Sequence, residues 1–229
     1  MKKSFFVAGT NTDVGKTYVA HLLLKAAQKK GLSTLGLKPV AAGGLIDVDG
    51  EMRNEDAVSL MAASTKQLSY AQVNPVCLEA AIAPHIAAAE EGKRLRASDL
   101  TAKVRGALMS PAEFNLIEGA GGWRVPLNER EYLSELPKEL DLPVILVVGM
   151  SLGCLSHAYL TVEAIRRDGL QLAGWVANTI GERMDRYDEN LDWMRHTIPA
   201  PCLGVLDYCV NEPEDFQVDK LDISPLLTK

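Results

Sequence analysis

Short apolar runs alternate with amphipathic segments along most of this chain. Six apolar runs bounded by turn residues have the form of buried strands, and they lie at residues 4–9, 34–40, 114–119, 143–149, 172–178 and 202–208. Apolar residues recur at helical spacing in five further segments, at 16–30, 54–63, 97–109, 155–167 and 185–197. Strands separated by helices predict an α/β fold, with a mostly parallel sheet covered by helices on both faces.

The composition supports one globular unit. The chain has 229 residues, of which 47% are hydrophobic, and it shows no repeat, low-complexity segment or linker. We therefore expect a single domain over residues 1–229. The segment at 41–53 is rich in glycine and aspartate and is expected to be a loop, while the acidic C-terminal tail predicts only a final helix or strand.

Charge and cysteine content narrow the class of protein. The net charge of -6 argues against a nucleic-acid partner, which would require clustered lysine and arginine. The apolar run at 143–150 is far shorter than the roughly 20 residues of a membrane span, so no membrane partner is expected. The four cysteines form no CxxC pair, which favours reduced, mostly buried thiols and a cytoplasmic location; they are Cys77, Cys154, Cys202 and Cys209.

The stretch GTNTDVGKT at residues 9–17 is the first candidate for chemistry. It departs from the usual phosphate-binding pattern, because Thr10 stands where that pattern has glycine and the glycine lies one place earlier. Its Gly-Lys-Thr nevertheless falls between a predicted strand and a predicted helix. There, loop amides hold phosphates, Lys16 reaches the terminal phosphates and the Thr17 hydroxyl joins Mg²⁺. The alternative is a plain strand–helix turn.

Three charged residues lie where they can complete such a site. Glu118 ends an apolar strand and precedes glycines, and ligands of open α/β sheets bind at the carboxyl ends of strands. A glycine-rich turn without function explains the same pattern. Asp56 lies in the first turn of the helix that Asn54 can cap, where the helix dipole alone also accounts for an acid. Lys38 closes the second strand, either as a surface lysine or as a phosphate contact.

A resemblance to a known family appears when these pieces are read in order. Nine stretches of the sequence resemble those of the dethiobiotin synthetases. In chain order they are GTNTDVGKT, GLKPVA, RNEDA, VNP, EGAGGW, LPVILVVG, LGCLSHAYLT, LAGWVAN and IPAPCLG. The similarity runs from the first strand to about residue 215. It implies a P-loop NTPase-like fold, a homodimer and an ATP-dependent cyclo-ligase of biotin biosynthesis. It also implies ATP as co-substrate and Mg²⁺ as cofactor.

The resemblance further implies a reaction. One amine of 7,8-diaminopelargonic acid takes up CO2 as a carbamate, and the carbamate oxygen attacks the γ-phosphate of ATP. The second amine then attacks the mixed anhydride, which closes the ureido ring of dethiobiotin and releases phosphate. Positioning and charge neutralisation dominate such phosphoryl transfer. No covalent enzyme nucleophile is required.

The resemblance assigns roles to particular residues. Lys38 and Lys16 are the expected catalytic residues, and Thr17, Asp56 and Glu118 the metal ligands. The other expected nucleotide contacts are Asp13, Val14, Gly15, Tyr18, Gly119, Ala120, Gly121, Asn178, Thr179, Asp207, Tyr208, Cys209 and Glu214. Expected substrate contacts are Ala42, Ser151, Leu152, Gly153 and Cys154. Asn178 would pair with adenine N6 and N7, as Asn does in DNA readout, although a strand-end turn residue is the alternative.

Three positions depart from the family pattern. Ala42 replaces a Ser or Thr, and Asp207 stands where a proline is common, which affects diamine binding and base selectivity respectively. Ser151 stands where a lysine can occur, and its missing charge can come from Arg183 or Arg186. None of these departures touches Lys16, Thr17, Lys38, Asp56 or Glu118, the residues expected to carry the reaction.

Three other functions share parts of this pattern. A cobyrinate-type amidotransferase normally carries a further domain with a nucleophilic cysteine, for which this chain is too short. A partitioning ATPase carries an additional lysine early in its loop, whereas the loop residues before Gly15 include no lysine here. A GTPase would carry an N-K-x-D motif, which the chain lacks. Nucleotide binding without turnover remains open for a divergent member.

Overall fold

The computed structural model describes residues 2–109, 112–208 and 214–228 of the chain. Its main sheet has six parallel strands in the order β10-β9-β8-β1-β7-β2. In chain order these are β1 (Lys3–Gly9), β2 (Thr34–Leu37), β7 (Phe114–Glu118), β8 (Val144–Gly149), β9 (Leu172–Asn178) and β10 (Cys202–Leu206). The predicted α/β fold with a parallel sheet is therefore confirmed.

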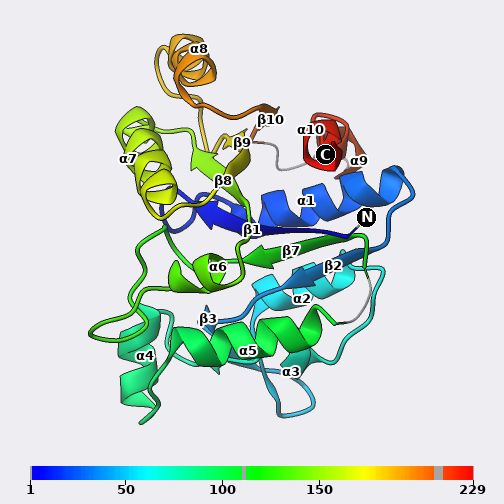
Figure 1. Ribbon diagram of the computed structural model, residues 1–229, viewed down its shortest axis with the longest axis vertical. Coiled ribbons are helices and arrows are strands. Elements are labelled where there is room, and N and C mark those ends of the chain that lie inside the picture. Colours follow the sequence, from blue (N-terminus) through cyan, green and yellow to red (C-terminus); the bar gives the residue numbers. More distant parts are fainter. Residues whose placement is uncertain (1, 110–111, 209–213, 229) are drawn as a thin grey trace.

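Helices cover both faces of this sheet (Figure 1). The longer ones are α1 (Lys16–Lys29), α2 (Glu55–Ala62), α5 (Ala97–Ala107), α7 (Cys154–Arg167) and α8 (Tyr187–Thr197). The shorter ones are α3 (Tyr70–Val73), α4 (Pro84–Glu90), α6 (Glu135–Glu139), α9 (Glu214–Val218) and α10 (Ser224–Leu227). Figure 1 shows α1 beside α9 and α5 beside α6. Among the described residues, no helix combines the length and apolar character that a membrane crossing needs.

The alternation of side chains along β1 explains the two hydrophobic cores. Successive side chains of a strand point to opposite faces of the sheet. Phe5 and Val7 therefore pack in the core that contains α1, whereas Phe6 and Ala8 pack in the core that contains α5 and α7. All four are buried. A strand that is buried on both faces requires a continuous apolar run, which is the pattern seen in the sequence.

The prediction that residues 41–53 form a loop was wrong in part, because the segment contains short strands. It contains β3 (Ala41–Ala42), which pairs in parallel with β6 (Cys77–Leu78), and the antiparallel pair β4 (Leu45–Ile46) and β5 (Met52–Arg53). Each of these strands has two residues, too few to show an alternation. β6 thus runs beside β3, the part of the chain that follows β2 close to the carboxyl edge of the main sheet.

Other predictions need smaller corrections. The second strand ends at Leu37 rather than at residue 40, while the acidic tail forms the short helices α9 and α10. The thiols are not mostly buried: Cys154 is buried, but Cys77 and Cys202 are only partly so, and none of the three is in a disulfide. Cys209 lies outside the described residues.

Candidate active site

The loop between β1 and α1 has the geometry of a phosphate-binding loop. Gly15 is the N-cap of α1 and has a left-handed backbone with φ of +79°. A Cβ at this position would lie 2.2 Å from Nδ2 of Asn178, so glycine is required for both conformation and space. The loop therefore delivers the chain directly to the N-terminus of a 14-residue helix, where backbone amides favour an anion.

The displaced glycine of this loop now has a steric explanation. A Cβ on Gly9 would lie 2.8 Å from Cγ2 of Val14 and 2.9 Å from the carbonyl oxygen of Asn11, so the folded loop leaves no space for one. Thr10, which occupies the usual glycine position, instead bonds to β8. Its amide donates to Val147 O at 3.0 Å, and its hydroxyl accepts from the Gly149 amide at 3.4 Å.

Lys16 bends back over the loop. Its side chain is buried, and its Nζ donates to the carbonyl oxygen of Asn11 at 3.2 Å. Burial, together with the neighbouring charge of Lys38, lowers the pKa of Lys16 to about 8. A bound anion would offset that cost of burying the ammonium group. A lysine in this position suits a site that receives negative charge.

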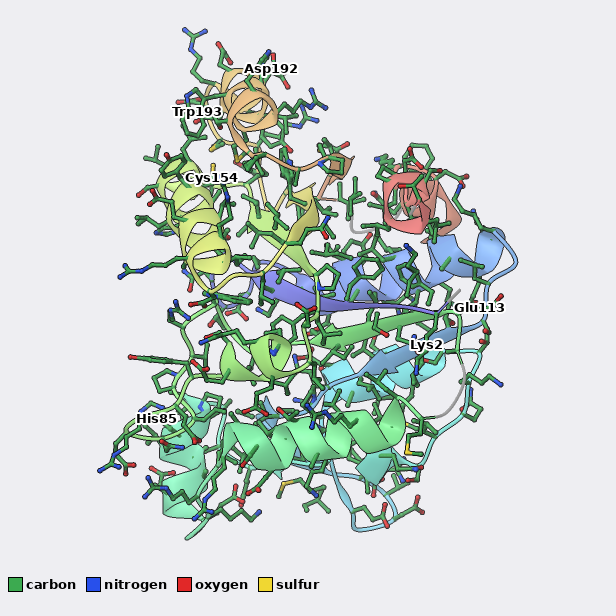
Figure 2. All side chains as sticks on the ribbon, in the orientation of Figure 1. Lys2, His85, Glu113, Cys154, Asp192 and Trp193 are labelled. Carbon is green, nitrogen blue, oxygen red and sulfur yellow. The ribbon has the colours of Figure 1, made fainter. Side chains whose placement is uncertain are left out.

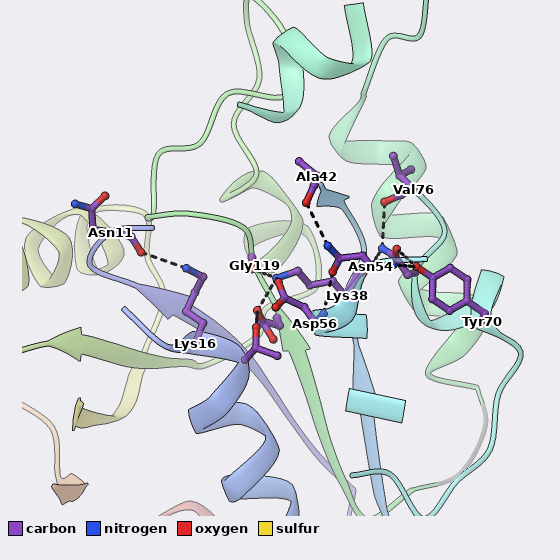
Figure 3. Close-up of polar contacts among 12 residues, drawn as sticks. Asn11, Lys16, Lys38, Ala42, Asn54, Asp56, Tyr70, Val76 and Gly119 are labelled. Atoms are coloured by element: carbon purple, nitrogen blue, oxygen red, sulfur yellow. Dashed lines mark hydrogen bonds and ion pairs between the residues drawn. The ribbon is translucent and has the colours of Figure 1, made fainter. Parts of the chain in front are cut away.

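Lys38 meets Glu118 and Asp56 beside the loop, and Figure 3 shows Lys38 against Asp56. Lys38 Nζ lies 2.5 Å from Glu118 Oε1 and 2.8 Å from Asp56 Oδ2, and it also donates to Gly119 O at 3.2 Å. The hydroxyl of Thr17 donates to the same Glu118 Oε1 at 2.8 Å. Lys38 is thus no surface lysine, since its side chain is 4% exposed. The fold thus brings Lys38 and Asp56 together with Thr17 and Glu118, which are themselves 101 positions apart in the sequence.

The charges of this cluster stabilise one another. Burial works to lower the pKa of Lys38, but the charges of Glu118 and Asp56 outweigh it and raise that pKa above the ordinary value. Partial burial similarly works to raise the pKa of Asp56, but Lys38 and hydrogen bonds hold it below its usual range. Lys38 and Asp56 are therefore both charged at neutral pH.

The oxygen atoms of the cluster fit a hard divalent cation. Glu118 is fully enclosed, and its second oxygen, Oε2, has no hydrogen-bond partner within the described chain. Asp56 and the Thr17 hydroxyl place further oxygen atoms nearby. No group of three or more His, Cys, Asp or Glu suited to a metal occurs in the described ranges. Mg²⁺ is usually bound through one or two carboxylates, with phosphates and water completing its coordination.

Asn178 lies where it was predicted, but its amide nitrogen is already engaged. It ends β9 and is 5% exposed, and its Nδ2 donates to Val14 O at 2.9 Å. Its side chain therefore fastens the phosphate-binding loop to the sheet. The side-chain oxygen remains as the atom that can accept from an adenine amine. The bidentate pairing expected from the sequence stays a prediction.

The other predicted base contacts are spread over two segments. Thr179 is buried and its hydroxyl bonds to Tyr187 at 2.9 Å, while Tyr208 is 60% exposed. Asp207 pairs with Arg183 at 2.6 Å and Lys220 at 3.3 Å, and the bond with Arg183 is the main reason that its pKa is lowered. Cys209 lies outside the described residues, and Glu214 begins α9.

The glycine-rich turn after Glu118 packs on the phosphate-binding loop. A Cβ on Gly119 would lie 2.8 Å from the Phe6 ring, and Gly121 has φ of +55°, so both positions favour glycine. Asp13, with φ of +57°, and Tyr18 lie exposed at the other side of the loop. Ala120 is partly buried against the core. These positions agree with the predicted phosphate contacts without testing them.

The predicted substrate residues fall into two groups. Ser151, Leu152 and Gly153 are exposed at the N-terminus of α7, with Leu152 at 95%. Cys154 is different, because its side chain is buried in the core at the end of α7 nearest α8 (Figure 2). Ala42, in β3, is partly buried, and its carbonyl oxygen accepts from Asn54 Nδ2 at 3.2 Å. A side-chain contact from Cys154 to substrate therefore has no support.

Three further residues, which the sequence patterns did not assign to the site, lie next to this cluster. They are Asn54, Tyr70 and Asn74, which hydrogen-bond to one another beside Lys38 and Asp56 (Figure 3). Asn54 was predicted only as a helix cap, and its Oδ1 does accept from the Asp56 amide at 3.1 Å. The available signal was the presence of Asn54 and Asn74 in the stretches RNEDA and VNP.

A phosphate-binding loop between a strand and a helix, on a parallel sheet with helices on both faces, defines the chain as a P-loop nucleotide-binding protein. Solved structures agree on this fold. MinD of Pyrococcus horikoshii has a TM-score of 0.53 at 16% identity, covering 90% of this chain and 81% of that one. A ParA family ATPase of Chlorobium tepidum has a TM-score of 0.52 at 13% identity, covering 99% and 88%. A family model described as an AAA domain matches residues 3–211.

Curated relatives are far more similar. The ATP-dependent dethiobiotin synthetase BioD of Cellvibrio japonicus is 56% identical over 226 residues, covering 99% of this chain and 98% of the relative. The protein of the same name from Pseudomonas paraeruginosa is 49% identical, covering 97% of each chain. The chain belongs to the ATP-dependent dethiobiotin synthetase family. The resemblance found in the sequence is thereby confirmed.

Proposed function

We propose that this chain closes the ureido ring of dethiobiotin from 7,8-diaminopelargonic acid, CO2 and ATP. The family supports the overall reaction, since its members are named ATP-dependent dethiobiotin synthetases. The observation that carries the assignment of residues is the contact of Lys38 with both Glu118 and Asp56, beside Lys16 and Thr17. We expect one domain over residues 1–229 to perform the whole reaction.

The proposed chemistry has three steps. An amine of the substrate adds to CO2 and loses a proton, which gives a carbamate. A carbamate oxygen then attacks the γ-phosphorus of ATP and displaces ADP. The second amine finally attacks the carbamoyl carbon, expelling phosphate and closing the ring. The carbamate is a poor electrophile, and phosphorylation converts its oxygen into a leaving group.

Lys38 and Lys16 supply the positive charge that these steps require. The carbamate and the γ-phosphate are both anions, so their approach is opposed by repulsion that two ammonium groups offset. Both lysines are buried, where charges interact more strongly than in water. Lys16 lies over the loop and would contact the terminal phosphates, whereas Lys38 lies on the β7 side and would face the carbamate.

Thr17, Asp56 and Glu118 are proposed to hold Mg²⁺. The donor set is composed of oxygen atoms, and the enclosed Glu118 Oε2 has capacity for a ligand. When bound, the ion neutralises phosphate oxygens during transfer. The two carboxylates orient the site by fixing Thr17 and Lys38, through bonds of 2.8 Å and less.

The remaining contacts are proposed from family resemblance and position. Residues 13–18 and 119–121 would surround the triphosphate, and Asn178, Thr179 and the segment from Asp207 to Glu214 would surround the base. Ala42 and residues 151–153 would contact the diamine. A homodimer is proposed because α7 exposes Tyr159 and Leu160 near this loop, an apolar surface of the kind that partners cover.

Phosphate release from MgATP tests the function. It is measured with and without diamine and bicarbonate, with dethiobiotin identified by mass spectrometry. Wild type is compared with Lys38→Ala and with Lys138→Ala, whose lysine pairs with Glu135 at the surface. We expect release to need both co-substrates and to collapse only in Lys38→Ala. Equal hydrolysis without the diamine, and no dethiobiotin, would overturn the proposal.

A further inference from the structure

Asn54, Tyr70 and Asn74 have no role in the chemistry proposed above, yet they form one connected hydrogen-bond network beside it (Figure 3). Asn54 and Asn74 are 7% and 3% exposed, so nearly all of their polar atoms must be satisfied inside the protein. Tyr70 lies in the four-residue helix α3, against Arg53, whose guanidinium is 5.4 Å from the ring centroid.

The first half of the network reaches the backbone of Lys38. Asn74 Nδ2 donates to the carbonyl oxygen of Lys38 at 2.6 Å and to that of Val76 at 3.1 Å. The amide of Lys38 donates in turn to Val73 O at 2.9 Å. Both backbone polar groups of Lys38 are thus fixed by the segment at 73–74, in a stretch where β2 has already ended.

The second half reaches Asp56 and Ala42. The side chain of Asn54 accepts from the Asp56 amide at 3.1 Å and donates to Ala42 O at 3.2 Å. It therefore sets the first turn of α2, on which the Asp56 carboxylate is carried. It also holds β3 against that turn.

One hydroxyl joins the two halves. Tyr70 accepts from the backbone amide of Asn54 at 2.7 Å and donates to Asn74 Oδ1 at 2.8 Å. Burial raises the pKa of Tyr70, so the hydroxyl keeps the proton that it donates. Because Lys38 Nζ also contacts Asp56 at 2.8 Å, the connections close into a ring that runs through Lys38, Asn74, Tyr70, Asn54 and Asp56.

We propose that the Tyr70 hydroxyl is a positioning group for the reaction. It fixes the Lys38 backbone relative to the first turn of α2, and so sets where the Lys38 ammonium and the Asp56 carboxylate meet. This inference rests on the proposed function, in which those two groups act on the carbamate and the metal. Tyr70 itself touches neither reacting group. A misplacement of about 1 Å in such a site costs on the order of a hundredfold in rate.

Tyr70→Phe tests the proposal, because it removes one oxygen and leaves the ring and its contact with Arg53. The matched control is Ser64→Ala. The Ser64 hydroxyl likewise accepts one backbone amide, from Gly36 at 2.9 Å, and donates to Leu60 O at 2.7 Å, but it follows the C-terminus of α2. Each variant loses one hydroxyl that accepts one hydrogen bond and donates another, partly buried at Tyr70 and buried at Ser64.

We expect Tyr70→Phe to lower kcat about ten- to a hundredfold. Ser64→Ala should keep kcat within about twofold. Equal effects of the two variants on kcat would show that Tyr70 contributes only to stability and would overturn the inference. If Tyr70→Phe does not fold, Asn74→Ser is measured instead, because it interrupts the same ring of hydrogen bonds at the residue to which Tyr70 donates. We expect the same fall in kcat.

A binding measurement supplies the second readout. The affinity for Mn²⁺, measured by electron paramagnetic resonance with a non-hydrolysable ATP analogue, should fall about tenfold in Tyr70→Phe, because the Asp56 ligand shifts. It should be unchanged in Ser64→Ala. An unchanged affinity together with an unchanged kcat overturns the inference. If wild type makes no dethiobiotin, the proposed function fails, and the Mn²⁺ comparison still decides whether Tyr70 positions Asp56. If wild type neither makes dethiobiotin nor binds Mn²⁺, the proposed function and this inference are both overturned.

Discussion

The ammonium group of Lys38 lies 2.5 Å from Oε1 of Glu118, and both side chains are enclosed by protein. A lysine that directly follows one strand and a glutamate that ends its neighbour meet there because β2 and β7 pair in parallel and end at the same edge of the sheet. Two buried charges at this distance depend on each other. Removal of either one leaves the other desolvated and poorly paired.

The first prediction concerns the energetic coupling of this pair. Lys38→Met and Glu118→Gln should each lower the free energy of unfolding by about 3 kcal/mol, since each leaves a buried charge without its partner. The double variant should cost less than the sum, by about 1 kcal/mol or more. Urea denaturation of the four proteins measures this. Strictly additive losses would mean that the two groups do not interact in solution.

A second prediction separates backbone strain from steric conflict at Gly15. Gly15 and Gly31 have φ of +79° and +80°, but only at Gly15 would a Cβ meet a neighbour, namely Asn178. Gly31→Ala should cost about 1 to 2 kcal/mol of stability, from the left-handed backbone alone. Gly15→Ala should cost about 1 kcal/mol more, because it displaces the amide that bonds to Val14 O. It should also weaken ATP binding, measured by calorimetry, whereas Gly31→Ala should not.

The third prediction concerns acid stability at Asp168, the C-cap of α7. Its carboxylate accepts from Trp123 Nε1 at 2.8 Å and from two nitrogens of Arg124 at 2.5 and 2.7 Å. Burial works to raise the pKa of Asp168, but these bonds outweigh it and hold the pKa below 3.8. The stabilisation is therefore fully present above pH 3.8 and is lost as the pH falls through the lower, folded-state value.

Asp168→Asn should accordingly lower the free energy of unfolding at pH 7 by about 1 to 2 kcal/mol, a modest value because Arg124 is 40% exposed to screening solvent. The difference from wild type should narrow below about pH 4. Urea denaturation between pH 3 and pH 7 measures it. A difference that stays constant over this range would show that the charge of Asp168 does not matter.

A fourth prediction separates the residues of the loop that opens α7. Leu152 is 95% exposed, so Leu152→Ala should change the free energy of unfolding by less than about 0.5 kcal/mol. If the loop contacts the diamine as proposed, the KM for the diamine should rise severalfold.

Cys154→Ala is the matched variant, because its side chain is buried two positions later. It should cost about 1 kcal/mol in stability and leave the KM for the diamine unchanged. The reverse pattern, with the KM altered only in Cys154→Ala, would contradict the placement of these two side chains.

Local patterns along the chain were enough to predict the main elements of this protein and the type of its site. Apolar runs specify strands buried on both faces, and helical spacing specifies the covering helices, because both signals are local and repeat along the chain. Gly15, Lys16 and Thr17 carry their meaning in adjacent positions between a strand and a helix. Their role was therefore predictable without knowledge of any distant contact.

The contacts of Lys38, Asp56 and Asn178, in contrast, could not be predicted before the folded arrangement was known. Spacing alone favoured a surface lysine, a helix-dipole acid and a turn residue, because their partners lie on other elements and burial is a property of the whole fold. The same reason hid Tyr70, whose two partners are 16 positions before it and 4 after it. Strands of two residues, such as β3, likewise have no periodicity of their own. β3 forms because the fold brings the chain after β2 beside β6, and hydrogen bonds between such distant segments also fix the site.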